Sequence, residues 1–253
     1  MSDRSCRFLP RLWRAAGVAL AAALLIVAPS ARAQERPPVA QQMSKTYGLD
    51  AFDRIEKIRF TFNFEFPGGK ISRSWEFDPK TDQISYEGKD KDGKPVKLSY
   101  NRSRLASESD VVRNEIEPAF TNDEYWLFFP LHVSWDLSAK VTDEGLQKLQ
   151  LGEGSANKVV VKYPSDGGFA PGDTWELYVG DDHQIKELAY HGGAPGVQKR
   201  PGLLNVTWAG HKKAGPLLFS TDHVGTADGK PIRVYLSDVS VKFTGSDSWI
   251  NAE

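Results

Sequence analysis

The chain has 253 residues, of which 40% are hydrophobic and 26% are charged, with 32 lysines and arginines against 33 aspartates and glutamates. This balance provides no basic stripe and argues against nucleic-acid binding. The single cysteine excludes a disulfide framework and a cysteine-ligated metal site.

Residues 1–33 have the pattern of a secretory signal peptide. Four arginines precede the apolar run 15–28, and an Ala-x-Ala cleavage site ends at Ala33. The run of about 14 residues is shorter than the roughly 20 that a membrane-spanning helix needs, and an uncleaved anchor is the alternative. We predict a mature protein of residues 34–253 in a bacterial periplasm, with no membrane span after cleavage. Its net charge is about −5, and it lacks cysteine because Cys6 is removed.

The mature chain begins with a predicted helix. Met43, Tyr47 and Phe52 are spaced roughly as one helical face. The pattern predicts a helix over residues 38–46, a break at Gly48 and a short helical turn after it.

A heavily aromatic strand is predicted next. Residues 58–66 alternate in type, which places Phe60, Phe62 and Phe64 on one face of a strand. After a Pro-Gly-Gly turn, residues 70–77 return with Trp75 in the same apolar register. Two further strands, over residues 83–87 and 95–101, complete an antiparallel meander with one apolar face.

Arg73 lies in the apolar register of the second strand, between Ile71 and Trp75. A buried arginine is costly unless its charge is paired. An inward Arg73 therefore predicts either a carboxylate partner or a contact with the polar head of an otherwise apolar ligand. An outward Arg73 on a twisted strand is the alternative.

The centre of the chain predicts a second helix. Residues 103–117 are mixed and charged and are interpreted as helix or loop. Thr121 or Asn122 is suited to cap a helix that runs toward Trp135 and is limited by Pro130.

The central helix carries Trp126, Phe128 and Phe129 among its aromatic residues. A helix that is apolar on nearly every side is expected to be buried. We predict that it covers the apolar face of the sheet and touches the aromatic residues of the first two strands.

Residues 143–151 predict one or two further helical turns, and strands follow. Trp175 lies on the apolar face of one of these strands, which a hairpin turn at 180–184 joins to the next. A bulge is expected near residues 237–238. The six predicted strands are 159–163, 174–179, 185–190, 203–210, 217–226 and 230–243.

These elements predict a mainly β (α+β) fold with one domain over residues 34–253. We expect a single large antiparallel sheet of about ten strands, curled into an unclosed β-barrel and lidded by the N-terminal helix and the central helix.

Motifs for catalysis are absent from the sequence. No pair of the five histidines has metal-ligand spacing, and no Gly-x-Ser-x-Gly or phosphate-binding glycine motif occurs. We therefore predict no catalytic residue, metal or cofactor. An exported hydrolase whose histidines and carboxylates converge only in the fold is the alternative.

The predicted exported chain opens with a helix and continues with an aromatic strand. It then has the stretch Gly69-Lys-Ile-Ser-Arg-Ser-Trp-Glu-Phe-Asp-Pro-Lys-Thr-Asp-Gln-Ile-Ser-Tyr. This order and this stretch resemble the LolA-like superfamily of periplasmic lipoprotein carriers and outer-membrane receptors. The resemblance covers residues 56–87 at the level of the motif. It implies an unclosed antiparallel barrel that is lidded by helices and binds acyl chains.

The aromatic residues suggest a function in ligand binding, although an ordinary core between sheet and helix is the alternative for them. We predict a monomeric, non-enzymatic periplasmic protein that holds a lipid-like or acylated ligand and takes part in envelope lipid or lipoprotein transport, with envelope proteins as partners. A structural component of an envelope complex is the third hypothesis. The predicted ligand-binding residues are Phe60, Phe62, Phe64, Arg73, Trp75, Trp126, Phe128, Phe129 and Trp175.

Overall fold

The computed structural model describes residues 35–166, 171–193 and 202–253, which belong to one compact unit, Ala33–Glu253. The predicted signal peptide lies outside the described residues. No described helix is both long enough and apolar enough to cross a membrane.

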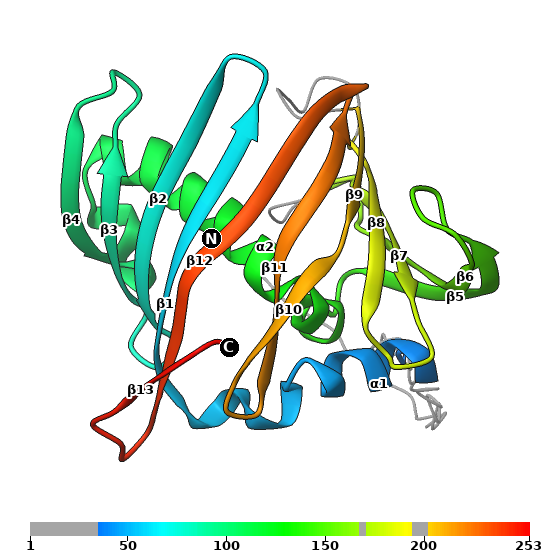
Figure 1. Cartoon of the computed structure of the whole chain (residues 1–253). Helices are drawn as coiled ribbons and strands as arrows, with labels where there is room; N and C mark the ends of the chain where they lie inside the picture. Colours follow the sequence, from blue (N-terminus) through cyan, green and yellow to red (C-terminus); the bar gives the residue numbers. More distant parts are fainter. Residues whose placement is uncertain (1–34, 167–170, 194–201) are drawn as a thin grey trace, which may run out of the picture. The chain divides into compact units, whose positions relative to one another are not determined.

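One antiparallel sheet organises the unit (Figure 1). The strand order is β4-β3-β2-β1-β12-β11-β9-β8-β7-β6-β5, while β10 pairs with β11 and β13 pairs with β12. The path ends at β4 and β5, which do not pair with each other, so the sheet is not closed. The strands are β1 (Ile55–Phe66), β2 (Gly69–Asp78), β3 (Gln83–Lys89), β4 (Pro95–Asn101), β5 (Lys140–Lys148), β6 (Ser155–Lys162), β7 (Thr174–Val179), β8 (Ile185–His191), β9 (Leu203–Thr207), β10 (Ala209–Ala214), β11 (Leu217–Ala227), β12 (Lys230–Phe243) and β13 (Trp249–Asn251).

This architecture confirms the predicted fold class, an unclosed antiparallel sheet accompanied by a few helices. The expected number of about ten strands was too low, since the described residues form 13. One predicted strand divides at Trp208 into β9 and β10, and the short β13 near the C-terminus was missed. The predicted hairpin between β7 and β8 is confirmed.

The helical segments are α1 (Pro38–Thr46), the 3-10 segments η1 (Leu49–Arg54) and η2 (Arg102–Ser107), the π-helix η3 (Val112–Ile116) and α2 (Glu117–Trp135). The predicted N-terminal helix is confirmed, and so is its break at Gly48, whose φ of +99° lies in the left-handed region that glycine adopts without strain. Helix α1 packs against α2, where the Ser44 hydroxyl donates to the Pro130 carbonyl at 2.7 Å.

Helix α2 differs from the prediction at both ends. It begins at Glu117, directly after η3, and Thr121 is a buried residue of the helix and not its cap. Pro130 lies inside the helix and does not end it. A proline removes one helical hydrogen bond, but buried side chains on both sides of it, including Phe128 and Val133, hold the helix in place.

The predicted helical turns at 143–151 were wrong, because this segment forms most of β5, paired with β6. The register shifts between Asp143 and Leu146, and Gly145 there has a φ of +72°. Such a bulge disrupts the two-residue alternation by which a strand is recognised in a sequence. By contrast, the bulge expected near residues 237–238 is confirmed by the register shift opposite Asp238, whose φ is +55°.

Candidate functional site

Aromatic side chains of α2 fill one face of the sheet, which we call the helix face. Phe120 packs edge-on against Trp75 of β2, with 5.2 Å between ring centroids. Phe128 meets Phe219 of β11 at 6.1 Å, and Phe129 lies 4.6 Å from Trp175 of β7. The helix therefore crosses the sheet from β2 to β7, as Figure 1 also shows.

The predicted cover is present. Phe120 and Asp123, earlier in the helix than residues 125–129, contact Trp75 of β2. The early start of α2 places its first turns over β2.

Arg73 points to the helix face and has a carboxylate partner, which is one of the two possibilities predicted for an inward Arg73. Its guanidinium donates to both carboxylate oxygens of Asp123, at 2.6 and 2.5 Å, and the indole of Trp75 donates to the same carboxylate at 2.9 Å. Asp123 is fully buried, and burial raises its pKa even though Arg73 and Trp75 stabilise the charged form. The ion pair joins sheet to helix, so Arg73 is not free to hold a ligand on its own.

The nine predicted ligand-binding residues fall into two groups. The fully buried ones are core side chains of the sheet and of α2, which fits an ordinary core between sheet and helix. The others are partly exposed. The buried group comprises Phe60, Phe62, Trp75, Phe128 and Phe129, and the partly exposed group comprises Phe64, Arg73, Trp126 and Trp175.

Space for a ligand lies where β2 and β3 separate. The two strands pair only from Asp78 with Gln83 to Ser74 with Glu87. Beyond that point β2 pairs with β1 alone and β3 with β4 alone, so the two hairpins diverge, as Figure 1 shows. A pocket of about 1050 Å³ occupies this divergence, which we call the β2–β3 opening. Its lining consists of residues 70–74, 86–91, 93, 95–97, Glu115, Ile116 and Ala119.

Gly88 shapes one side of the opening. The ring of Tyr86 lies over it, so that a Cβ on residue 88 would fall 2.3 Å from the Tyr86 hydroxyl. That hydroxyl donates to the Lys89 carbonyl at 2.7 Å. A glycine at this position lets the tyrosine fold along β3, which leaves the space beside β2 open.

The opening has an apolar wall and a charged rim. Ile71 of β2, Val96 of β4, and Ile116 and Ala119 of the helical segment supply apolar side chains to its lining, and lysines stand around them. An apolar cleft with a few charged groups at its mouth is suited to a molecule with an apolar body and a polar end. Sequence reasoning identified Arg73 here but missed the other lining residues, because no local pattern indicates where paired strands separate.

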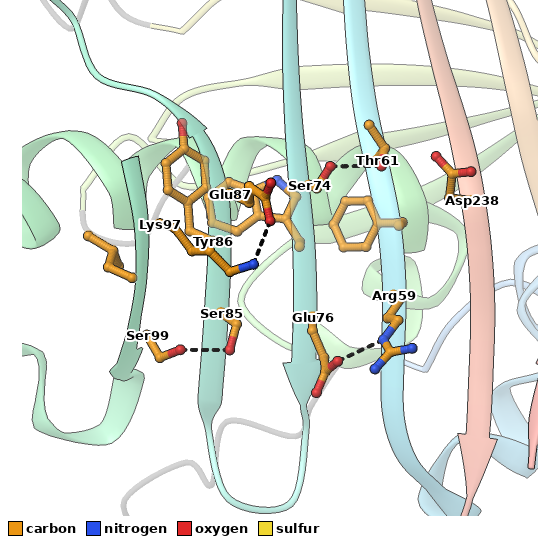
Figure 2. Close-up of a pocket in the computed structure, with 13 residues that line it drawn as sticks. Arg59, Thr61, Ser74, Glu76, Ser85, Tyr86, Glu87, Lys97, Ser99 and Asp238 are labelled. Atoms are coloured by element: carbon orange, nitrogen blue, oxygen red, sulfur yellow. Dashed lines mark hydrogen bonds and ion pairs between the residues drawn. The ribbon is translucent and has the colours of Figure 1, made fainter. Parts of the chain in front are cut away.

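The opposite face of β1–β4 carries a second pocket of about 520 Å³, lined by polar and apolar side chains. Figure 2 shows its hydroxyl pairs, Thr61 with Ser74 at 3.0 Å and Ser85 with Ser99 at 2.8 Å. Arg59 and Glu76 close it with an ion pair at 2.7 Å. These polar groups are therefore paired with one another.

His132 of α2 lies between two carboxylates, Glu124 at 3.1 Å and Asp136 at 3.2 Å. The other Asp136 oxygen accepts hydrogen bonds from the hydroxyls of Tyr125 and Tyr163. Burial alone would lower the pKa of His132, but the two carboxylates raise it to about 9. His132 is 9% exposed, and neither pocket described above is lined by a histidine. This cluster is a buried charged network that ties α2 to the segment after it.

His223 of β11 is enclosed by Trp126 and Trp208, with ring centroids 5.2 and 4.1 Å away. Neither of its ring nitrogens has a hydrogen-bond partner among the described residues. Burial therefore lowers the pKa of His223 to about 3 and keeps the imidazole neutral. The described residues contain no group of three or more histidine, cysteine or acidic side chains placed to hold a metal ion.

No protein-family model and no curated protein matches this chain. Among solved structures it is similar to a DUF1329 family protein from Desulfovibrio piger, with a TM-score of 0.43 and 10% identity over 83% of this chain and 92% of that one. It is also similar to the Mycobacterium tuberculosis lipoprotein LppX, with a TM-score of 0.30 and 10% identity over 80% of this chain and 94% of that one.

A third similar structure is a chain of the Pseudomonas aeruginosa MucA/MucB complex, with a TM-score of 0.26 and 11% identity over 80% of this chain and 94% of that one. Structural similarity at these identities and TM-scores does not allow the function of these proteins to be assigned to this chain. The relation to the LolA-like superfamily stays a prediction from the sequence.

Proposed function

We propose that this is an exported, non-enzymatic binding protein that holds a lipid-like ligand at the β2–β3 opening. The observation that carries the proposal is the pocket of about 1050 Å³ between the diverging hairpins, walled by apolar side chains of β2, β4 and the helical segment. Sites for drug-sized ligands typically enclose roughly 300–1,000 Å³, so this space suffices for an acyl chain.

The proposed site differs from the one expected from the sequence, because it lies at the β2–β3 opening and not among the aromatic residues of the helix face. Five of the aromatic residues predicted to bind it are buried between the sheet and α2, including Phe128 and Phe129 of the helix itself. Inserting a ligand there would require α2 to leave the sheet and would break the ion pair between Arg73 and Asp123. The opening needs no such change. Periplasmic location and a role in lipid or lipoprotein transport belong to this proposal.

The test is binding of an uncharged, environment-sensitive fluorescent probe to the mature chain, with native mass spectrometry of protein purified from a periplasm. We expect saturable binding and a co-purified acyl species. Ala119→Trp places a large ring in the opening and should weaken probe binding at least about tenfold. Ala106→Trp, on the exposed η2 segment outside the opening, is the matched control. Unchanged binding in Ala119→Trp would remove the opening as the site.

A further inference from the structure

Four hydroxyl side chains form a diagonal across β1–β4, on the face of the sheet opposite α2. Thr61 pairs with Ser74 in one cross-strand row, and Ser85 pairs with Ser99 in the row beside it. Ser74 and Ser85 lie on neighbouring strands two residues out of register, so they are diagonal neighbours. Figure 2 shows this diagonal, which we call the hydroxyl groove, running from Ser99 to Thr61.

Longer, charged side chains stand on both sides of the hydroxyl groove. Arg59 pairs with Glu76 at 2.7 Å on one side, and Lys97 pairs with Glu87 at 2.9 Å on the other (Figure 2). Together with the hydroxyls they line the pocket of about 520 Å³. Asp238, at the end of the groove on β12, adds one negative charge to these neutral pairs. The groove therefore does not favour an anionic ligand.

The hydroxyl groove retains unused hydrogen-bonding capacity. Thr61 and Ser74 share one hydrogen bond at 3.0 Å, and Ser85 and Ser99 share one at 2.8 Å. A hydroxyl has one O–H donor and two acceptor lone pairs, so one bond within each pair leaves one donor and three lone pairs for a ligand. Closely spaced donors and acceptors without net charge suit the hydroxyls of a polyol.

The hydroxyl groove runs into the β2–β3 opening. Ser74, Glu87 and Lys97 line both pockets, and Ser74 with Glu87 is the last pair before the two strands separate. Ile71 and Ser72 are consecutive in β2 and point to opposite faces of the sheet, yet both line the opening. The opening therefore leads from the hydroxyl groove to the apolar wall on the helix face.

We infer that the ligand is an amphiphile with an uncharged, hydroxyl-rich head group. The head lies in the hydroxyl groove near Ser74 and Ser85, while the chain passes through the opening to Ile116 and Ala119. This inference rests on the proposed function and adds the chemical class of the ligand. Sugar and glycerol heads share this chemistry. Because such a head carries no charge, added salt should leave its recognition unchanged.

The experiment uses the mature chain and displacement of N-phenylnaphthylamine by octyl glucoside, octylglycerol and octanol, which share one chain, all below micelle-forming concentrations. We expect octyl glucoside to compete about tenfold better than octanol, which corresponds to one or two net hydrogen bonds. This ratio should fall toward one in Ser74→Ala/Ser85→Ala and stay constant as salt is added. Ser107→Ala/Ser155→Ala, which removes two exposed serines outside both pockets, is the matched control and should keep the wild-type ratio.

The octylglycerol arm separates the two sources of the head group. An advantage over octanol equal to that of octyl glucoside would assign a glycerol-type head, and a smaller advantage would assign a sugar.

Equal competition by octyl glucoside and octanol in the wild type, or an unchanged ratio in Ser74→Ala/Ser85→Ala, would overturn the inference and leave the proposed function standing. Stronger competition by octylammonium than by octyl glucoside would also overturn it, since Asp238 would then select a cation. Absence of any probe binding would instead refute the proposed function itself.

Discussion

Arg73 of β2 and Asp123 of α2 form a doubly hydrogen-bonded ion pair across the boundary between sheet and helix. The arginine side chain is 18% exposed and the aspartate side chain 0%. Removing one member of such a pair leaves an uncompensated buried charge, which is more costly than losing both.

We therefore expect Arg73→Leu to lower the free energy of unfolding by roughly 3 to 5 kcal/mol. The double variant Arg73→Leu/Asp123→Leu should lose less than Arg73→Leu alone, because no charge is then left buried. Urea unfolding of the wild type, Arg73→Leu, Asp123→Leu and the double variant forms a double-mutant cycle. Losses that simply add would show that the two residues do not act as a pair.

Phe128 tests whether α2 is a packed part of the core. It is 2% exposed and touches Phe52, Trp135 and Phe219. Phe128→Ala should cost roughly 3 to 5 kcal/mol, since it opens a cavity that its rigid neighbours cannot fill. Leu137→Ala, at a site that is 64% exposed, is the control and should change stability by less than about 0.5 kcal/mol. A small loss in Phe128→Ala together with altered probe binding would instead indicate a ligand-filled space.

The raised pKa of His132 predicts that the protein loses stability as the pH rises into mild alkali. Its folded pKa of about 9 lies above the ordinary value of 6.5, so its contribution is complete below pH 6.5 and disappears as the pH rises to about 9. The contribution lost across that window is on the order of 3 kcal/mol. Urea midpoints measured through the window should fall in the wild type and stay flatter in His132→Gln. A wild-type slope in the variant would assign the pH dependence to another group.

The lowered pKa of His223 predicts the opposite pH dependence of stability, a loss as the solution becomes acidic. Its folded pKa of about 3 is below the ordinary 6.5, because burial disfavours the charged imidazolium. The unfolded chain takes up this proton first, so stability falls as the pH drops from 6.5 toward 3, by on the order of 5 kcal/mol. His223→Leu should remove the part of this slope above about pH 5, while His191→Leu at an exposed strand end should not. The prediction fails if both variants keep the wild-type slope.

Glu187 of β8 anchors the β5–β6 connection. Its buried carboxylate accepts backbone N–H groups of Gln150, Leu151 and Gly152, at 2.6 to 3.1 Å. Glu187→Ala should cost roughly 2 to 4 kcal/mol by leaving these donors without their charged acceptor. Glu187→Gln should recover less than half of the loss, because its amide NH₂ turns a donor toward donors. Full recovery by glutamine would mean that the charge is unimportant. Thermal unfolding of the three proteins gives the ranking.

Regular alternation and turn residues made most of the fold predictable from the sequence. The phenylalanines of β1, the bounds of α1, the β7–β8 hairpin and the bulge at Asp238 depend on local periodicity and backbone preference, which neighbouring residues determine among themselves. Alternation offered the inward direction of Arg73 and its need for a partner as one of two possibilities, and the ion pair with Asp123 decided between them. The signal peptide is a prediction of the sequence alone.

Tertiary structure decided the rest, because the interactions concerned join residues far apart in the chain. The partner of Arg73 was set by the earlier start of α2, and the passage of that helix through Pro130 was set by packing on both of its sides. The strand at 140–148 was hidden by its own bulge and is stabilised by pairing with β6. The β2–β3 opening has no local signal at all, because the point where two strands stop pairing depends on the backbone hydrogen bonds that each makes with its other neighbour.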